Sequence, residues 1–269
     1  MIPFPQTLEA LLERPFLTSH DWERFSERLV EILPLIREEE TILCVEEDSV
    51  EALAVFFAGV LKKGAVFFGN SRWQKAEWEQ VNQVSGFHRI FGPAGLDVDS
   101  SRTSVFRDAR IMIPSGGTSG KIRFCVHTLN TLSAAVGSLF QFHGRKPLNS
   151  VSPLPVFHVS GLMPVLRACL TGGMVHLAHW KAIEAGAFPS LPGNPSSISL
   201  VPTQLARLVR IRGGLQFLHG FDSIYIGGGK TPPGLVNTIR GEKLPVLFVY
   251  GMTETAAMVV AGTRASTDG

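Results

Sequence analysis

The stretch Ile111-Met-Ile-Pro-Ser-Gly-Gly-Thr-Ser-Gly-Lys-Ile-Arg-Phe124 begins as an apolar run and then breaks into glycine and hydroxyl residues followed by cations. This order is typical of a strand that leads into a phosphate-binding loop. Glycine lets backbone N–H groups approach an anion closely, serine and threonine add donors, and lysine or arginine balances the charge. The sequence therefore predicts a strand at 109–113 and a phosphate loop directly after it.

A second stretch, Val249-Tyr-Gly-Met-Thr-Glu-Thr255, places an aromatic ring beside a hydroxyl and a carboxylate at the end of another apolar run. Such a set can contact a nucleotide base, a phosphate and a metal ion together. Taken in this order along the chain, the two stretches predict a nucleotide-dependent activation of a carboxylate.

Other phosphate and nucleophile motifs do not fit the first stretch. The Walker A pattern fails because Lys121 is followed by Ile122, and neither G-x-G-x-x-G nor G-x-S-x-G occurs in this stretch. A plain Gly/Ser turn between two elements remains the alternative interpretation, since loop-like composition is common.

Helical and strand patterns alternate along the chain. Helices are expected at 21–37 (interrupted near Pro34), 49–62, 130–143, 203–212 and 233–240. Strands are expected at 41–45, 65–68, 109–113, 151–154, 174–177, 197–201, 223–226 and 246–250. This alternation predicts an α/β fold of mainly parallel sheets flanked by helices. Ligands of such sheets bind beyond the carboxyl ends of the strands, where the phosphate loop, 227–229 and 250–254 fall.

Four segments resemble, in order, the motifs of the acyl-adenylate-forming (AMP-binding) ligases. They are the phosphate loop at 115–123, an aromatic/His gate at 157–161, a Gly-rich turn beside the adenine at 225–232, and Y-G-x-T-E at 250–254. Segments 126–128, 154–161 and 199–207 are most similar to the o-succinylbenzoate–CoA ligases within that family. The resemblance implies the N-terminal part of the ligase fold.

The phosphate loop departs from the usual family pattern at two positions. Ile122 stands where the family usually has proline, and Arg123 stands where it usually has lysine. Arginine keeps the charge and adds a planar fork of donors, so phosphate binding is expected to survive with altered geometry.

The resemblance implies ATP and coenzyme A as substrates and Mg²⁺ as the metal ion. The catalytic residues would be Thr253 on the α-phosphate, Glu254 on Mg²⁺, His158 and Arg123. The nucleotide-binding residues would be Ser115, Gly117, Thr118, Ser119 and Gly120 on the phosphates, and Gly228, Gly229, Tyr250 and Gly251 around the adenine. The acyl group would be bound by His158, Ser160 and Ser199.

Each of these roles has a plainer alternative. His158 can be a hydrogen-bonded structural histidine, and Tyr250 an ordinary aromatic at a strand end. Glu254 can be a solvated acid, and Ser199 a hydrogen-bonded strand serine. For His127, which follows the loop, a structural role is expected.

Composition limits the class of protein further. A formal net charge of +2 gives no reason to expect a nucleic-acid partner. The three cysteines, Cys44, Cys125 and Cys169, form no C-x-x-C pair and are expected to be reduced, mostly core residues. No apolar run reaches the ~18 residues that span a membrane, and no secretory signal precedes the fold, so a cytoplasmic protein is expected.

Two α/β subdomains are expected, with the division in the Pro/Gly-rich loop at 191–197. The first, 1–190, would contain the phosphate loop, and the second, 191–269, the Gly-rich turn and the Y-G-x-T-E motif. Members of the family continue into a mobile C-terminal domain that supplies a ribose-binding Asp, a hinge and a lysine. That domain is expected to be a partner absent from this chain, so the chain alone is expected to be inactive. Oligomeric state is left open.

The resemblance implies an ATP-dependent CoA ligase that activates o-succinylbenzoate through an acyl-adenylate, in menaquinone or phylloquinone biosynthesis. Three alternatives stay open. They are an aryl- or fatty-acyl–CoA ligase, an adenylation domain that loads a carrier protein, and a non-catalytic nucleotide- or substrate-binding module.

Overall fold

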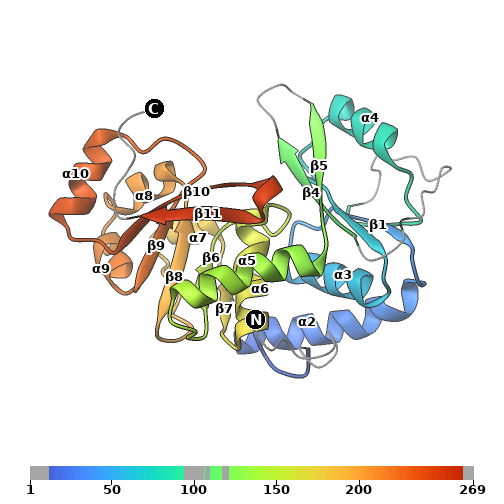
Figure 1. Cartoon of the computed structure of the whole chain (residues 1–269), viewed down its shortest axis with the longest axis horizontal. Coiled ribbons are helices and arrows are strands. Elements are labelled where there is room, and N and C mark those ends of the chain that lie inside the picture. The colour runs from blue at the N-terminus through green and yellow to red at the C-terminus, as the bar shows by residue number, and fades with distance from the viewer. Residues whose placement is uncertain (1–11, 94–105, 107–109, 117–120, 263–269) are drawn as a thin grey trace.

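The computed structural model describes residues 12–93, 106, 110–116 and 121–262. Two sheets form two lobes that lie side by side (Figure 1). The first sheet has the strand order β3-β1-β2-β4-β5 and consists of β1 (Thr41–Cys44), β2 (Ala65–Phe68), β3 (Arg89–Phe91), β4 (Arg110–Gly116) and β5 (Ile122–His127). Its strands are parallel except for the antiparallel pair β4–β5.

The two central strands β1 and β2 are buried along their whole length, as expected of parallel strands covered on both faces. Helix α3 (Ser49–Leu61) is the crossover between them. Its first turn is capped by Asp48, whose side chain accepts hydrogen bonds from the N–H groups of Val50 at 2.8 Å and Glu51 at 3.2 Å. Asp48 therefore satisfies two of the N–H groups that have no partner within the helix.

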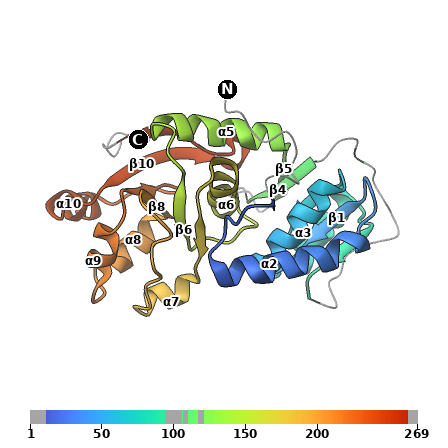
Figure 2. The same cartoon turned by 90° about the horizontal axis from the view of Figure 1, so that it is seen from below.

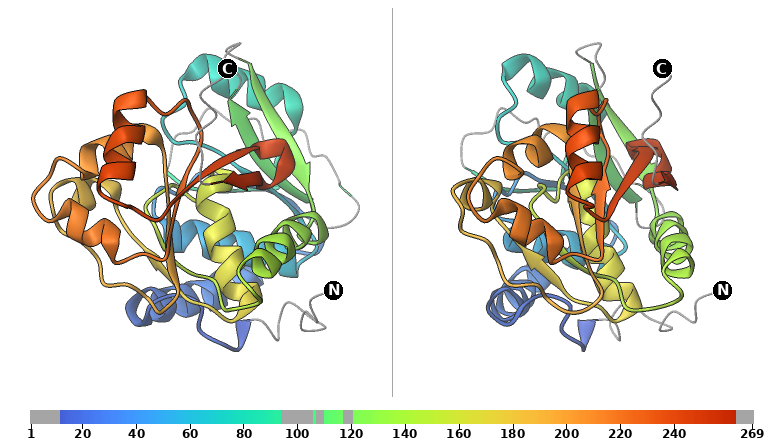
Figure 3. Two further views of the ribbon diagram at one scale, coloured as in Figure 1. Left: turned by 60° about the vertical axis from the view of Figure 1, so that its left-hand side comes forward. Right: turned by 90° about the vertical axis from the view of Figure 1, so that its left-hand side faces the viewer.

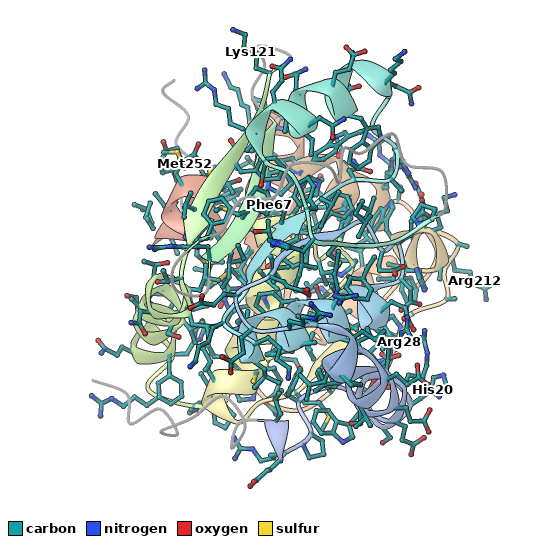
Figure 4. All side chains as sticks on the ribbon, turned by 90° about the vertical axis from the view of Figure 1, so that its right-hand side faces the viewer. His20, Arg28, Phe67, Lys121, Arg212 and Met252 are labelled. Carbon is teal, nitrogen blue, oxygen red and sulfur yellow. The ribbon has the colours of Figure 1, made fainter. Side chains whose placement is uncertain are left out.

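Helices cover both faces of the first sheet; Figure 2 shows α2 and α3 together on one face, and Figure 1 shows α4. Helix α2 (Ser19–Ile32), followed by the 3₁₀ turn η1 (Leu33–Leu35), packs with α3 through Phe25 and Phe57. Helix α4 (Lys75–Val84) lies on the opposite face, where Trp78 joins the cluster around Phe67. Phe67 is labelled within this lobe in Figure 4.

The second sheet has six strands in the order β11-β10-β9-β8-β6-β7. They are β6 (Asn149–Ser152), β7 (Val175–Leu177), β8 (Ser196–Leu200), β9 (Ser223–Ile226), β10 (Val246–Met252) and β11 (Ala257–Gly262). Only the pair β10–β11 is antiparallel, and the 3₁₀ turn η2 (Thr253–Thr255) joins these two strands.

Helices also flank the second sheet. One face is covered by α5 (Leu129–Phe142) and α6 (Val159–Thr171). The apolar cluster around Ile198 and Ile224 packs the sheet against the other helices. These are α7 (Trp180–Glu184), α8 (Pro202–Leu208), α9 (Gly214–His219) and α10 (Pro233–Gly241). The predicted α/β fold of mainly parallel sheets flanked by helices is confirmed.

The two lobes share one core. Helix α6 runs between them (Figure 3), and its residues Leu162 and Val165 belong to the same buried cluster as Ile42 and Val66 of the first sheet and Val175 of the second. The segment before α2 also crosses over. The N–H of Val175 donates to the carbonyl of Phe16 at 2.8 Å, and the N–H of Thr18 donates back to the carbonyl of Val175 at 3.2 Å.

The sheets do not change at the expected boundary between 190 and 191. The change falls between His127 and Asn149, because β6 and β7 pair into the same sheet as β8. The loop at 191–197 therefore connects α7 to a neighbouring strand of one sheet. Proline and glycine are common both in such a connection and in a joint between subdomains, so composition alone does not distinguish the two. The subdomain assignment itself stays a prediction.

Several elements were not predicted, among them α4, α6, β3, β5 and β11. Helix α6 was obscured by Pro164 in its interior, a residue that usually ends a helix. All three cysteines are free; Cys44 and Cys169 are buried, and burial raises the pKa of each thiol to about 12. No helix in the described part of the chain is both long and apolar enough to cross a bilayer.

Candidate active site

The hairpin β4–β5 meets the turn η2 between the two lobes, where Figure 1 shows η2 beside the strands of the hairpin. Ser115, near the end of β4, pairs with Arg123 on β5. The hydroxyl of Ser115 donates to a carboxylate oxygen of Glu254 at 3.3 Å. This contact joins the two stretches from which the sequence predicted a nucleotide site, although they lie 139 residues apart.

His127 holds η2 against the hairpin. Its Nε2 donates to the carbonyl oxygen of Thr253 at 2.8 Å, and its Nδ1 lies 3.3 Å from the hydroxyl of Thr131. Because side chains alternate along a strand, Arg123 and Cys125 lie on the same face of β5 as His127. The buried His127 therefore has the structural role expected for it, and its face of β5 is the one turned toward η2.

The carboxylate of Glu254 is fully exposed and is stabilised in its ionised form. Its own backbone N–H lowers its pKa most, and hydrogen bonds from Cys125 and Ser115 lower it further. The pKa of the neighbouring Cys125 thiol is raised, first by burial and then by the charge of Glu254. An anionic carboxylate thus stands beside a protonated thiol that sequence reading had assigned to the core.

A pocket opens next to this contact, beyond the carboxyl ends of β8, β9 and β10, which is where the parallel sheet was expected to bind ligands. Its wall includes Ser160 and Arg167 from α6, Ser199 from β8, Tyr225 from β9, Gly228 after β9, and Thr253. The polar groups that line it therefore come from α6, from the ends of β8 and β9, and from η2.

Arg167 is the main feature that sequence reading missed. It is only 6% exposed, and its Nε has no hydrogen-bond partner within the described structure. Burial lowers its pKa to about 10, so it remains a cation at neutral pH. A buried guanidinium whose Nε–H is unpaired is costly, and an anionic ligand that accepts from it would relieve that cost. The available signal was a single cation inside the apolar run that forms α6.

Tyr225 and His143 form a polar pair behind Arg167. The Tyr225 hydroxyl is hydrogen-bonded to Nε2 of His143, which follows the last residue of α5. Burial raises the pKa of Tyr225. Burial, and then the charge of Arg167, lowers the pKa of His143. One electrostatic cluster thus connects the pocket wall to the end of α5.

Two glycines are required by the backbone around the pocket. Gly228 has φ +76°, a left-handed conformation that favours glycine. At Gly251 a Cβ atom would lie 1.7 Å from the carbonyl oxygen of Ala257, because β11 crosses very close to β10 there. Only a residue without a side chain fits at this crossing.

The predicted residues fall into four groups by position. Those that line the pocket are Ser160, Ser199, Gly228, Gly251 and Thr253. Those at the hairpin contact beside it are Ser115, Arg123 and Glu254. Those outside the pocket lining are His158, which precedes α6, Gly229, and Tyr250, which is 62% exposed. Those outside the described residues are Gly117, Thr118, Ser119 and Gly120. The functional roles of all of them stay predictions.

The model of the AMP-binding enzyme family matches residues 105–268, which include the hairpin, the pocket and η2. The chain therefore belongs to the AMP-binding enzymes. Within that family it is similar to 2-succinylbenzoate–CoA ligases. It is 31% identical over 155 residues to the enzyme of Listeria monocytogenes, and 25% identical over 193 residues to that of Bacillus subtilis. These matches cover 57% and 71% of this chain but only 33% and 39% of the relatives, so the chain spans well under half of the curated relatives it matches.

Solved structures show the same fold at low sequence identity. MenE of E. coli, bound to an analogue of OSB-AMS, superposes with a TM-score of 0.69 at 19% identity, covering 89% of this chain and 56% of that one. The o-succinylbenzoate–CoA synthetase of Bacillus subtilis in complex with AMP gives 0.65 at 20% identity, covering 90% of this chain and 68% of that one. The expected N-terminal part of the acyl-adenylate-forming fold is confirmed.

Proposed function

We propose that this chain is part of an enzyme that activates a carboxylate with ATP as an acyl-adenylate and transfers the acyl group to coenzyme A. The observation that supports this most is the contact between Ser115 and Glu254, which brings the phosphate loop and the Y-G-x-T-E turn together at the edge of a polar pocket. The similar 2-succinylbenzoate–CoA ligases support the same reaction class.

The reaction would proceed in two steps. An oxygen of the substrate carboxylate attacks the α-phosphorus of ATP and pyrophosphate leaves; the sulfur of coenzyme A then attacks the acyl carbon and AMP leaves. Arg123 and the hydroxyl of Ser115 would bind the phosphates that become pyrophosphate, and Thr253 would donate to the α-phosphate. Because negative charge builds up in both steps, positioned donors and cations supply most of the acceleration.

We assign Glu254 as the protein ligand for Mg²⁺. Its carboxylate is exposed and anionic, and the described residues contain no cluster of three or more His, Cys, Asp or Glu side chains that would form a protein-only metal site. Mg²⁺ is usually held by one or two carboxylates together with substrate phosphates and waters, so this donor set fits it. When bound, the ion would neutralise phosphate charge.

The substrate is proposed to carry a second anionic group, as o-succinylbenzoate does. Arg167 supports this proposal, because it places a buried cation with an unpaired Nε in the wall of the pocket. The same observation speaks against a fatty-acyl chain, which would leave that cation without a partner. An aryl carboxylate with a single acidic group remains the second candidate substrate, since Ser160 and Ser199 could orient it without Arg167.

The test is calorimetric titration with a non-hydrolysable analogue of o-succinylbenzoyl-adenylate, compared with the benzoyl analogue that lacks the second carboxylate. We expect the first to bind at least about 10-fold more tightly, because a buried charge pair is worth 2 kcal/mol or more. Arg167→Leu should abolish this preference while the affinity for AMP is retained. Equal affinity for both analogues in the unmodified protein would contradict the assignment of a dianionic substrate. No binding of either analogue by the protein together with its proposed C-terminal domain would contradict the reaction class.

The wider context follows from the same proposal. The enzyme would act in menaquinone or phylloquinone biosynthesis in the cytoplasm. A C-terminal domain would supply the ribose-binding Asp and the lysine that contacts the carboxylate. Production of the CoA thioester from o-succinylbenzoate, ATP and coenzyme A by the protein together with such a domain would support this assignment.

A further inference from the structure

Helix α4 contacts the back of the hairpin that leads into and out of the phosphate loop. The N–H of Ile122, the first residue of β5, donates to Oε1 of Gln80 on α4 at 2.8 Å. The amide of Gln80 is itself oriented, because its Nε2 donates to the carbonyl of Ala76 one turn earlier at 3.3 Å. The first residue of β5 is therefore tied to a helix rather than only to its partner strand.

The side chains of the hairpin strengthen this attachment. Ile122 and Phe124 pack on the cluster that contains Trp78 and Val81 of α4. Since side chains alternate along β5, Arg123 projects from the opposite face, where it pairs with Ser115. The contacts of Ile122 with α4 restrain the backbone of β5 and thus the direction in which the side chain of Arg123 points. Figure 4 shows Lys121, the residue before Ile122, at the free end of this hairpin.

The bond to Gln80 depends on the residue type at 122. The family usually has proline there, and proline has no N–H to donate. Proline fixes its own φ angle, whereas isoleucine does not. In this chain the hydrogen bond from Ile122 to Gln80 of α4 restrains the backbone at the position where proline would restrain it through its fixed φ angle.

We propose that Gln80 is a positioning residue for the phosphate site: through the N–H of Ile122 it sets the direction of Arg123. This inference rests on the proposed function, in which Arg123 binds the β- and γ-phosphates. It predicts that loss of Gln80 lowers the affinity for ATP but not for AMP, because AMP lacks those two phosphates. If Gln80 only stabilised the fold, its loss would lower the affinity for both nucleotides alike.

The experiment measures the dissociation constants of ATP with Mg²⁺ and of AMP by calorimetry for Gln80→Met, with Gln83→Met as the control. Gln83 is an exposed residue of the same helix. We expect Gln80→Met to weaken the binding of ATP about threefold to tenfold, which is the effect of one lost hydrogen bond. The affinity for AMP should not change. Hydrogen exchange of the 121–127 backbone should accelerate. The control should change neither ligand.

A double-mutant cycle isolates the bond itself. Ile122→Pro removes the N–H that Gln80 accepts, so Gln80→Met should cause no further loss of ATP affinity in that background. Equal effects of Gln80→Met in both backgrounds, or equal losses for ATP and AMP, would overturn the inference.

Arg123 variants separate this inference from the proposed function. Arg123→Ala should weaken the binding of ATP more than that of AMP, and Arg123→Lys should have only a small effect on either. If Arg123→Ala weakens ATP binding while Gln80→Met does not, the positioning role is wrong and the phosphate assignment stands. If Arg123→Ala leaves the ATP-to-AMP ratio unchanged, the phosphate assignment fails and this inference fails with it.

Discussion

Glu254 is the residue at which the distant parts of the site meet. It lies on η2, accepts from Ser115 of β4, and stands beside Cys125 of β5. Its ionised form is stabilised by its own backbone N–H, although the side chain is exposed. An exposed, ionised carboxylate of this kind is suited to hold a metal ion together with substrate phosphates.

In the protein together with its proposed C-terminal domain, Glu254→Gln should therefore lower the rate of ATP–pyrophosphate exchange by at least about 10-fold, the usual size of a loss at a metal site. The substitution keeps the shape of the side chain and removes only its charge, so the melting temperature should not change. Glu242→Gln, at an exposed glutamate after α10, is the matched control. A rate within about twofold of the unmodified enzyme would rule out Glu254 as the metal ligand.

At the scale of elements, the hairpin β10–β11 shapes the pocket floor. The register of the pair shifts between Tyr250 and Gly251, and η2 forms the turn between the two strands. Gly251 and Ala257 approach each other so closely there that no side chain fits at 251. The positions of Thr253 and Glu254 depend on this crossing.

Gly251→Ala should destabilise the protein by about 1–3 kcal/mol, because the added methyl overlaps a carbonyl oxygen and the backbone must shift. Nucleotide affinity should fall as η2 is displaced. Gly241→Ala, at the end of α10 where a Cβ would meet nothing within 4 Å, should be neutral. Thermal unfolding of both variants is the measurement, and equal melting temperatures would contradict the close approach.

The end of α5 gives the fold a dependence on pH. Burial lowers the pKa of His143, so the folded state favours its neutral form. The unfolded chain has a histidine pKa of about 6.5 and binds more protons below that value, so stability is lost as pH falls through about 6.5. Burial lowers the pKa of His158 in the same direction, although that residue retains exposed surface.

His143→Gln should reduce the drop in melting temperature between pH 8 and pH 5.5, and the remaining drop should come in part from His158. The exposed His20 has no comparable surroundings, so His20→Gln is the control and should leave the drop unchanged. If His143→Gln shows the same pH dependence as the unmodified protein, His143 does not titrate as its surroundings imply.

At the scale of the whole molecule, one buried cluster holds both sheets together. Fully buried Leu162 of α6 belongs to this cluster, together with Val66 of the first sheet and Val175 of the second. The residues proposed for the active site are divided between the lobes, with Ser115 in one and Glu254 in the other. The shared core therefore holds the two lobes in the arrangement that brings Ser115 and Glu254 together.

Leu162→Ala should cost about 2–5 kcal/mol of unfolding free energy, since it leaves a cavity in this core. Backbone hydrogen exchange should accelerate in β2 and in β7 together, because the two lobes unfold as one unit. Val30→Ala, on an exposed side chain of α2, is the control. Acceleration confined to one lobe would show that the lobes unfold separately.

The sequence by itself determined the α/β class, most of the strands, and the stretches that meet at the site. Local signals are strong there: short, mostly apolar runs such as 41–45 and 65–68 form strands, and glycine and hydroxyl residues follow the predicted strands at 109–113, 223–226 and 246–250, where ligands are expected to bind. The pairing of Ser115 with Glu254 in one site could be anticipated only from the order of the motifs, because each motif is short.

Only the tertiary structure decided which sheet each strand joins and what lies behind the pocket. Strand pairing is set by contacts between residues far apart in the chain, so the composition of the loop at 191–197 could not reveal that β6 and β8 are neighbours. The positions of Arg167 in the pocket wall and of Cys125 beside Glu254 also depend on contacts between distant parts of the chain. An arginine in an apolar helix and a cysteine in a strand acquire a functional meaning from the pocket and the carboxylate that folding places beside them.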